Sequence, residues 1–122
     1  MPWTVLFHPE FQPEYEALPK EVRHELLARL NLLASKGPQL GRPTVDTLKG
    51  SSFGNMKELR FKCEGAWRFA FAFNPQRNAI VLCGGDKEGA DQSTFYLELI
   101  DKADARFATH IASLKKQSGS KL

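Results

Sequence analysis

Cations of the kind that bind phosphate lie inside the most apolar part of the chain. The stretch LRFKCEGAWRFAFAF, residues 59–73, is aromatic and strand-forming, but it also contains Arg60, Lys62 and Arg68. A strand that only fills a core needs no cations. Arginine suits an anionic ligand because its planar guanidinium binds two phosphate oxygens at once and stays charged. The sequence therefore suggests phosphate binding on one face of these strands.

The alternation of side chains along a strand predicts which residues share that face. In residues 67–73 the four large aromatic side chains point one way, whereas Arg68, Ala70 and Ala72 point the other way. The aromatic face must pack on helices. The face that carries Arg68 has only small residues beside it, which leaves space for a ligand.

The preceding strand repeats this arrangement. Its apolar residues point one way, whereas Glu58, Arg60 and Lys62 point the other way. If the apolar faces of the two strands align, Arg60 and Arg68 rise from the same face of adjacent strands. The alternative is that both arginines pair with Glu58 and Glu64 on an exposed face and bind no ligand.

Two more polar groups follow the next apolar run. Lys87 comes directly after Gly84-Gly85-Asp86, where glycines would let the chain turn sharply and keep the edge of a groove open. Phe95 and Tyr96 open the last helix, and Tyr96 could stack on a base or donate its hydroxyl to a phosphate. The alternatives are an ordinary turn at GGDK and aromatic rings that only fill the core.

The charge distribution points to the same region. The 122-residue chain has a net charge of +3. Six of its 17 basic residues and three of its 14 acidic residues fall between Lys57 and Lys87, which leaves eleven of each for the rest. Because the whole positive surplus lies in this window, we expect an anionic partner, with nucleic acid the leading candidate. The alternative is a solvated basic face.

Other chemistries have little support in the sequence. His8, His24 and His110 are scattered without metal-ligand spacing, and there is no G-x-S-x-G motif or glycine-rich phosphate loop. Cys63 and Cys83 each lie in a strand-like run and are interpreted as buried reduced thiols. We expect neither metal nor cofactor. No signal peptide and no bilayer-spanning run is recognised, so a cytoplasmic location without a membrane partner is expected.

The elements that must position these residues follow from the hydrophobic periodicity. Strands are predicted at residues 3–7, 56–62, 67–73 and 79–83. Helices are predicted at residues 10–17, 19–36 and 95–114, with a frayed tail at 115–122. The pattern leaves the state of residues 45–48 open. The order β-α-α-β-β-β-α describes one α+β domain, residues 1–122, with helices covering a mostly antiparallel four-stranded sheet.

Several of these segments together resemble a known group of toxins. They are ELRF, the G-x-W-R-F-A-F segment, a valine–leucine strand that ends in GGDK, and the helix FYLELIDKADARFATHI. The combination, which extends from Trp3 to about Leu114, resembles the RelE/ParE superfamily and in particular its phage-related HigB-like branch. The resemblance implies a RelE-like fold.

The resemblance also implies an activity and partners. Members of the RelE-like branch are ribosome-dependent endoribonucleases that cut mRNA in the decoding site, and a neighbouring gene encodes the antitoxin that silences them. Here it implies Arg60, Arg68, Lys87 and Tyr96 as the catalytic set, with Lys62, Phe95 and, at the groove edge, Lys57 as RNA-binding residues. The expected partners are therefore the ribosome, mRNA and an antitoxin of the helix-turn-helix DNA-binding type, with which a hetero-oligomer is conceivable.

The implied mechanism uses the RNA's own 2′-hydroxyl as nucleophile and leaves a 2′,3′-cyclic phosphate, without metal. Glu58 stands where some relatives carry a lysine, so the general acid and the general base stay open, with Lys87 and Lys57 as candidates. Two alternatives share the fold. One is a ParE-like inhibitor of DNA gyrase, and the other is a non-catalytic interaction module.

Overall fold

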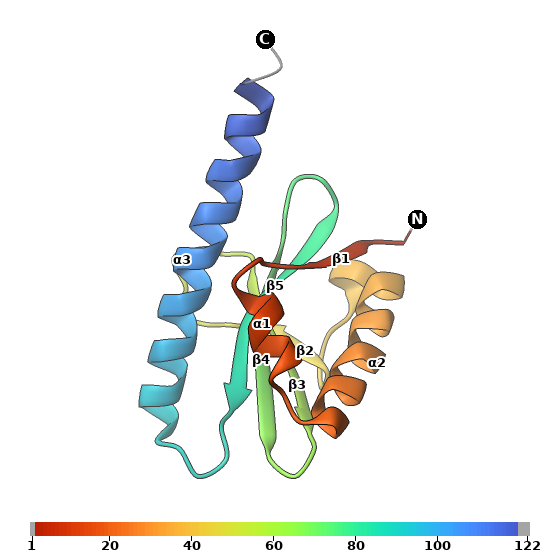
Figure 1. The fold of residues 1–122 in the computed structure, drawn as a ribbon, viewed down its shortest axis with the longest axis vertical. Coiled ribbons are helices and arrows are strands. Elements are labelled where there is room, and N and C mark those ends of the chain that lie inside the picture. The colour runs from red at the N-terminus through yellow and green to blue at the C-terminus, as the bar shows by residue number, and fades with distance from the viewer. Residues whose placement is uncertain (1, 120–122) are drawn as a thin grey trace.

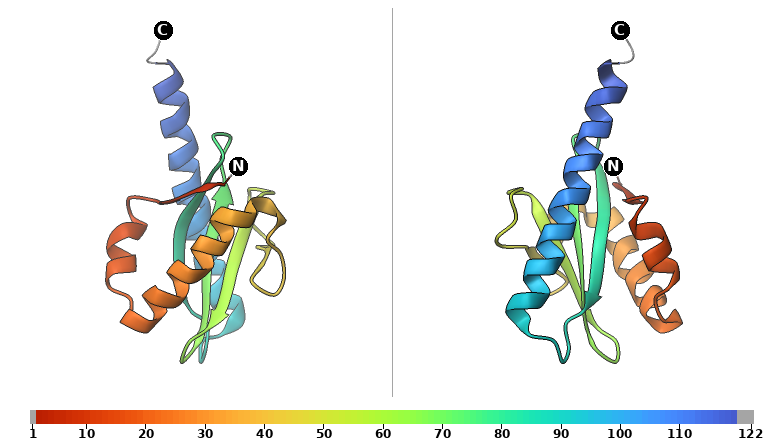
Figure 2. Two further views of the ribbon diagram at one scale, coloured as in Figure 1. Left: turned by 90° about the vertical axis from the view of Figure 1, so that its right-hand side faces the viewer. Right: turned by 60° about the vertical axis from the view of Figure 1, so that its left-hand side comes forward.

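The structure is a computed structural model that describes residues 2–119. A central β-sheet has helices on both faces (Figures 1 and 2). The elements in chain order are β1 (Thr4–Phe7), α1 (Phe11–Glu16), α2 (Lys20–Lys36), the short 3₁₀ helix η1 (Gly37–Gln39), β2 (Val45–Thr47), β3 (Met56–Lys62), β4 (Ala66–Phe73), β5 (Asn78–Asp86) and α3 (Gln92–Gly119).

The sheet has five strands in the order β1-β5-β4-β3-β2. β1 runs parallel to β5, and the other neighbours are antiparallel. The predicted α+β fold with a mostly antiparallel sheet is confirmed, but the predicted number of four strands is one too few. The additional strand is β2, which comes from the segment 45–48 whose state the pattern leaves open. Its three residues are too few to show a period of two, and pairing with β3 gives it its structure.

The aromatic face of the sheet packs on α1 and α2, as the alternation predicts. Phe69 and Phe71 of β4 lie in one core cluster with Phe11 of α1 and with Leu26 and Leu33 of α2. All five side chains are almost completely buried. This cluster fixes β3 and β4 with their other faces turned towards α3.

The opposite face is covered rather than open, which corrects the expectation that Ala70 and Ala72 leave space for a ligand. Both alanines are fully buried in a second core cluster with Ala103 and Phe107 of α3. Figure 2 shows α3 on one face of the sheet and the two N-terminal helices on the other. The small side chains let a helix approach the sheet closely, so the space above these two alanines is filled by α3 and not by a ligand.

The glycine pair near the end of β5 has a different role from the predicted one. β5 does not end there but continues to Asp86. A Cβ atom on Gly84 would lie 2.1 Å from Cδ1 of Phe69, and one on Gly85 would lie 3.3 Å from Cε1 of Phe95. The two glycines therefore admit aromatic rings to opposite faces of the strand.

α3 begins earlier and ends later than predicted. Asp91 caps its first turn, since the backbone N–H and the hydroxyl of Thr94 both donate to Oδ2 of Asp91 at 2.9 Å. Of the predicted frayed tail, residues 115–119 belong to α3 and residues 120–122 lie outside the described part. Within residues 2–119 no helix is both long and apolar enough to cross a membrane.

One ion pair connects the helices of the two faces around the edge of the sheet. Both guanidinium NH groups of Arg106 in α3 donate to the carboxylate of Glu14 in α1, at 2.9 and 2.6 Å. Arg106 also donates to the carbonyl of Leu82 at 2.7 Å, just beyond the last β5 residue that pairs with β1. Arg106 is buried, so this contact fastens α1, β5 and α3 together.

Candidate active site

The two arginines of the sheet lie beside each other. Arg60 of β3 is directly opposite Arg68 of β4 in the antiparallel register, and Leu59 is opposite Phe69. Cross-strand partners project to the same side of a sheet. The prediction that Arg60 and Arg68 share one face is therefore confirmed.

Arg68 is enclosed rather than exposed in an open hollow, and this corrects the prediction. Only 7% of the residue is exposed. Its guanidinium donates to the carbonyl of Trp67 at 2.9 Å and to the hydroxyl of Tyr96 at 3.3 Å. α3 causes this burial, because the second turn of that helix places Tyr96 beside β4.

Glu58 completes a compact group with these two residues. The hydroxyl of Tyr96 donates to Oε1 of Glu58 at 2.8 Å, and the same oxygen lies 3.7 Å from Nε of Arg68. Glu58 is 8% exposed. We call Glu58, Arg68 and Tyr96 the buried triad. The alternative pairing of Arg68 with Glu58 is thus observed, but with a phenol from another element inserted beside the ion pair.

Arg60 stands at the exposed side of the buried triad. About one third of its side chain is accessible, and its NH1 lies 3.6 Å from Oδ2 of Asp46 in β2. The partner of Arg60 is therefore Asp46 and not Glu64, which lies in the turn after β3 with a positive φ of 48°. A half-exposed guanidinium with a weak carboxylate contact remains available to an external anion.

Lys87 approaches the buried triad from the end of β5. Its Nζ lies 5.8 Å from the centre of the Tyr96 ring, and its backbone N–H donates to the carbonyl of Ala66 at 2.8 Å. Desolvation lowers the pKa of Lys87, and the positive charge of Arg68 lowers it further. An ammonium with a lowered pKa gives up its proton more readily than an ordinary lysine.

Tyr96 is held in its neutral form. Burial raises the pKa of its phenol, and the hydrogen bond to Glu58 raises it further. A protonated phenol between a carboxylate and a guanidinium can accept a proton only by passing its own to Glu58. The four predicted catalytic residues therefore converge on one place, together with a carboxylate.

The predicted RNA-binding residues divide between different places. Lys57 is opposite Phe71 in the register and lies on the face that packs against α2, so the prediction that it edges the groove is wrong. Its position, an odd number of residues from Arg60, turns it to the other side. Lys62 is exposed at the end of β3 on the same face as Arg60.

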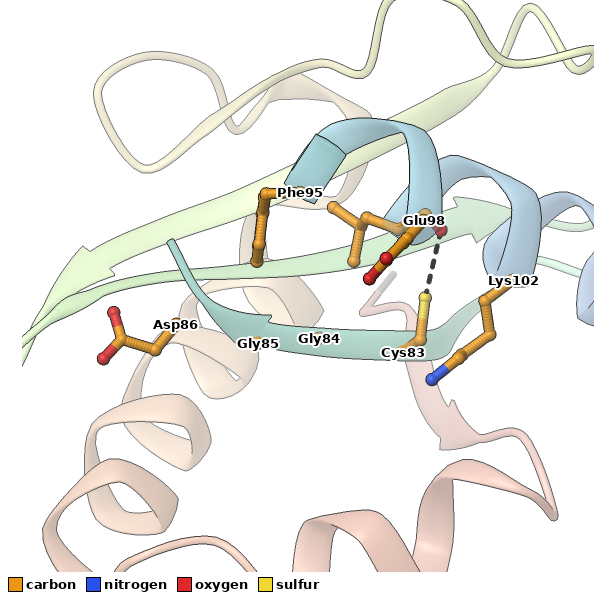
Figure 3. Close-up of a pocket in the computed structure, with 8 residues that line it drawn as sticks. Cys83, Gly84, Gly85, Asp86, Phe95, Glu98 and Lys102 are labelled. Atoms are coloured by element: carbon orange, nitrogen blue, oxygen red, sulfur yellow. Dashed lines mark hydrogen bonds between the residues drawn. The ribbon is translucent and has the colours of Figure 1, made fainter. Parts of the chain in front are cut away.

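Phe95 is half-buried and contacts the ring of Tyr96. Its ring meets that of Tyr96 edge-to-face, with centres 5.4 Å apart. With Glu98 and Lys102 of the same helix, it also lines a pocket of about 230 Å³, and the end of β5 forms the other side of this pocket (Figure 3). A buried thiol, Cys83, forms part of this pocket, and burial raises its pKa to about 12. The pocket contains no residue of the buried triad.

Two other pockets flank the buried triad. The first, of about 290 Å³, includes Arg29, Thr44, Arg60, Phe61, Lys62 and Arg68 in its lining, and we call it the basic pocket. The second, of about 300 Å³, includes Asp46, Thr47, Lys49, Glu58, Gln92 and Tyr96, and we call it the mixed pocket. An extended ligand could therefore occupy both pockets and cross the buried triad.

A comparison with protein families decides the relationship of this chain. The model of the family described as phage derived protein Gp49-like (DUF891) matches residues 13–108. That match covers most of the chain, including every residue of the buried triad. The chain belongs to the Gp49-like family.

Curated relatives of this Gp49-like protein include two proteins of Mycobacterium tuberculosis (strain ATCC 25618 / H37Rv) that are named as toxins. It is 42% identical to HigB2 over 100 residues, which is 80% of this chain but only 49% of HigB2. It is 39% identical to HigB3 over 110 residues, which is 90% of this chain and 95% of HigB3. The Gp49-like chain thus spans about half the length of one relative and nearly all of the other.

Solved structures share its fold at low sequence identity. A mutant of the E. coli toxin RelE in the free state matches with a TM-score of 0.61 and 16% identity, over 84% of this chain and 97% of that one. The archaeal RelE–RelB complex from Pyrococcus horikoshii OT3 matches with a TM-score of 0.52 and 18% identity, over 74% of this chain and 100% of the matched one. The predicted RelE-like fold of this Gp49-like protein is confirmed.

Three residues that the structure of the Gp49-like protein brings to the site are missing from the sequence-based prediction. Glu58 enters it as a possible ion-pair partner of the arginines and as a departure from some relatives, but not as a site residue. Asp46 lies in a segment of open state, and Arg29 lies in a helix on the other face. The sequence pattern could have placed Glu58 at the site, because it lies two positions from Arg60 in the same strand and therefore projects to the same face. No sequence pattern places Asp46 or Arg29 there, since only the packing of distant elements brings them near.

Proposed function

We propose that this protein is the toxin of a toxin–antitoxin pair and acts as an endoribonuclease on mRNA in the ribosome. The observation that carries the proposal is that Arg60, Arg68, Lys87 and Tyr96 lie together with Glu58, near one end of strands β3, β4 and β5. The relatives HigB2 and HigB3 are named as toxins, which supports the first part. The arginines and the phenol supply what RNA cleavage requires.

In the proposed reaction the 2′-hydroxyl oxygen attacks the adjacent phosphorus, and the bond from phosphorus to the 5′-oxygen breaks. The products are a 2′,3′-cyclic phosphate and a 5′-hydroxyl. Negative charge builds up on the phosphoryl oxygens in the transition state. Arg60 is accessible enough to bind these oxygens, and Arg68 supports them from behind at a fixed position.

Two proton transfers accompany the attack. The 2′-hydroxyl passes its proton to the Tyr96 oxygen while Tyr96 passes its own proton to Glu58, with which it already forms a 2.8 Å hydrogen bond. The Lys87 ammonium gives its proton to the departing 5′-oxygen, a transfer that its lowered pKa favours. This assignment replaces Lys57, which lies on the other face of the sheet.

An antitoxin is the proposed protein partner. The RelE fold of this chain occurs in a complex with RelB in the archaeal structure. An antitoxin that covers Arg60 and Lys87 would prevent RNA from reaching the buried triad. We expect it to be encoded beside this protein and to bind DNA through a helix-turn-helix.

The decisive test is the replacement of Arg68. We expect Arg68→Ala to reduce mRNA cleavage in programmed ribosomes by about 10²–10³ and to abolish growth arrest on expression. Because Arg68 is buried beside Glu58, Arg68→Lys is measured as well, since it keeps the charge but loses the planar fork. Circular dichroism and thermal unfolding identify variants that keep the fold, and Lys20→Gln on the exposed start of α2 is the control.

Full cleavage by a folded Arg68→Lys and a folded Arg68→Ala would overturn the assignment. Growth arrest that blocks DNA replication while translation continues would indicate a gyrase-inhibiting toxin of the ParE kind instead. No growth arrest at all by the intact wild-type protein, together with no cleavage, would indicate an interaction module.

A further inference from the structure

The basic pocket combines cations from both layers of the molecule. Arg29 comes from α2, which packs on one face of the sheet, whereas Arg60 and Arg68 come from the other face. They meet near the end of β3, where β2 begins at Val45 opposite Leu59 and the last backbone contact is the hydrogen bond that the N–H of Arg60 donates to the carbonyl of Thr44 at 2.8 Å. Every ionisable residue in the lining of this pocket is a cation.

Arg29 is fixed in place at the wall of the basic pocket. Its guanidinium carbon lies 5.0 Å from the centre of the buried Phe61 ring. One third of its side chain is exposed, and it pairs with Glu25 one helical turn earlier, itself 43% exposed. An exposed pair of this kind is weak, so a phosphate can replace the carboxylate of Glu25.

The mixed pocket on the other side of the buried triad differs in charge, because its ionisable lining residues are not all cations. Asp46 and Glu58 contribute carboxylates there, Gln92 and Tyr96 contribute an amide and a phenol, and Lys49 contributes an ammonium group. The carboxylates, the amide and the phenol suit the edges and hydroxyls of a nucleoside rather than its phosphate. The two pockets therefore differ in the part of a nucleotide that they accept.

We propose that the basic pocket binds a backbone phosphate of single-stranded RNA next to the cleaved one, and that Arg29 is one of the residues that bind it. This inference rests on the proposed function, because the RNA must also cross the buried triad. Arg29 makes its ion pair and its ring contact with Glu25 and Phe61, outside the buried triad, so it contributes to RNA affinity and not to the chemical step. A guanidinium on an aromatic ring presents its free N–H groups to the pocket.

The test measures binding of a short labelled single-stranded RNA whose 2′-hydroxyls are methylated, so that it is not cut. Fluorescence anisotropy over a series of salt concentrations compares the wild type with Arg29→Gln, Glu25→Gln and Lys20→Gln. We expect Arg29→Gln to weaken binding about fivefold or more and to reduce the slope of log affinity against log salt by about 0.7, the value for one lost phosphate contact on a single strand. Glu25→Gln removes the competing carboxylate and should tighten binding.

Lys20→Gln removes the same charge from the same helix outside the pocket and should leave the slope unchanged. Equal slopes for Arg29→Gln and Lys20→Gln would overturn the proposal, and so would binding that Glu25→Gln does not tighten. Wild-type protein that binds RNA through Arg29 but cuts no mRNA in ribosomes would overturn the nuclease function and leave this binding site intact. Wild-type protein that does not bind this RNA but still cuts mRNA in ribosomes would overturn the binding site and leave the nuclease function intact.

Discussion

At the scale of single residues, the buried triad shows why cations occur inside an apolar strand. Arg68 is almost completely buried, and such a charge is costly unless it is paired and hydrogen-bonded. Glu58 and Tyr96 supply that compensation from two other elements. A guanidinium held in this way loses little freedom when a phosphate approaches, which suits a group that stabilises a transition state.

The proposed role of Lys87 predicts a pH dependence. A general acid must be protonated, so cleavage should decline as the pH rises through the pKa of Lys87. Because desolvation and Arg68 lower that pKa, the decline should have its midpoint below the ordinary value of 10.5. Single-turnover rates on ribosome-bound mRNA between neutral and alkaline pH measure it.

Lys87→Arg provides the matched comparison. Arginine remains protonated throughout this range, so the variant should be slower by about 10²–10⁴ and its rate should not decline at alkaline pH. If the cleavage rates of the wild type and Lys87→Arg declined at alkaline pH with the same midpoint, the titrating group would not be Lys87.

The packing of Gly84 gives a prediction for stability. A methyl group on this residue would lie within 2.1 Å of the Phe69 ring, whose neighbours in the core leave it no room to move. Gly84→Ala should lower the free energy of unfolding by about 1–3 kcal/mol, the usual range for overpacking. Chemical denaturation measures it.

Gly54→Ala is the control, because a Cβ atom there would have no neighbour within 4 Å. Its free energy of unfolding should stay near that of the wild type. Equal stability of the two variants would mean that Gly84 does not make room for Phe69.

At the scale of elements, the position of the site follows from the lengths of strands and helices. β2 is short, so the end of β3 stays accessible and the basic pocket forms there. α3 starts at Gln92, early enough that its second turn brings Tyr96 to Glu58 of β3. The lower end of α3 and the ends of β4 and β5 lie together in Figure 1. The site is thus the boundary where the helix begins to cover the sheet.

The ion pair between α1 and α3 predicts that stability depends on pH in the acid range. The hydrogen bonds from Arg106 lower the pKa of Glu14 below its ordinary value of 4.5. The unfolded chain therefore binds a proton before the folded one does, and stability is lost as the pH falls through the folded pKa. Above the unfolded pKa the contribution is fully present.

Glu14→Gln should remove this component. We expect a loss of about 1 kcal/mol near neutral pH, a modest value because 40% of the Glu14 side chain is exposed and solvent screens the pair. The difference between wild type and variant should disappear at low pH. Glu16→Gln on the same helix is the comparison, and an equal acid dependence in Glu14→Gln and the wild type would contradict the prediction.

At the scale of the whole molecule, the proposed acid and base are weak groups, and neither is a histidine. Neither the phenol of Tyr96 nor the Lys87 ammonium is a strong catalyst at neutral pH. A ribosome that holds mRNA in a reactive conformation could compensate, since orientation can contribute roughly 7–11 kcal/mol. The molecule then supplies charge stabilisation and proton transfer, and its target supplies the geometry.

If the ribosome orients the mRNA, then cleavage by this protein should require the ribosome. Cleavage of an mRNA in programmed ribosomes should exceed cleavage of the same RNA free in solution by at least about 10³, well within the contribution of orientation. Primer extension on both substrates at equal protein concentration measures the ratio. Equal rates would show that the protein orients RNA by itself and would remove the ribosome from the mechanism.

The sequence by itself determined that Arg60 and Arg68 share a face and that the aromatic residues of β4 pack on helices. Both follow from the alternation of side chains, which is a property of each strand's own backbone. The same alternation turns Lys57 away from Arg60, against the role that the family resemblance implies for it. The resemblance, and not the alternation, brought Lys87 and Tyr96 to the same site.

Only the tertiary structure decided that α3 covers the face carrying Arg68, that Glu58 joins Tyr96, and that Arg29 reaches the basic pocket. Tyr96 and Glu58 are 38 positions apart, and no local pattern records their hydrogen bond. Small side chains such as Ala70 leave space on the sheet that either a ligand or a helix could fill. A helix fills it here because α3 must bury its apolar face, and where it can do so depends on the whole sheet.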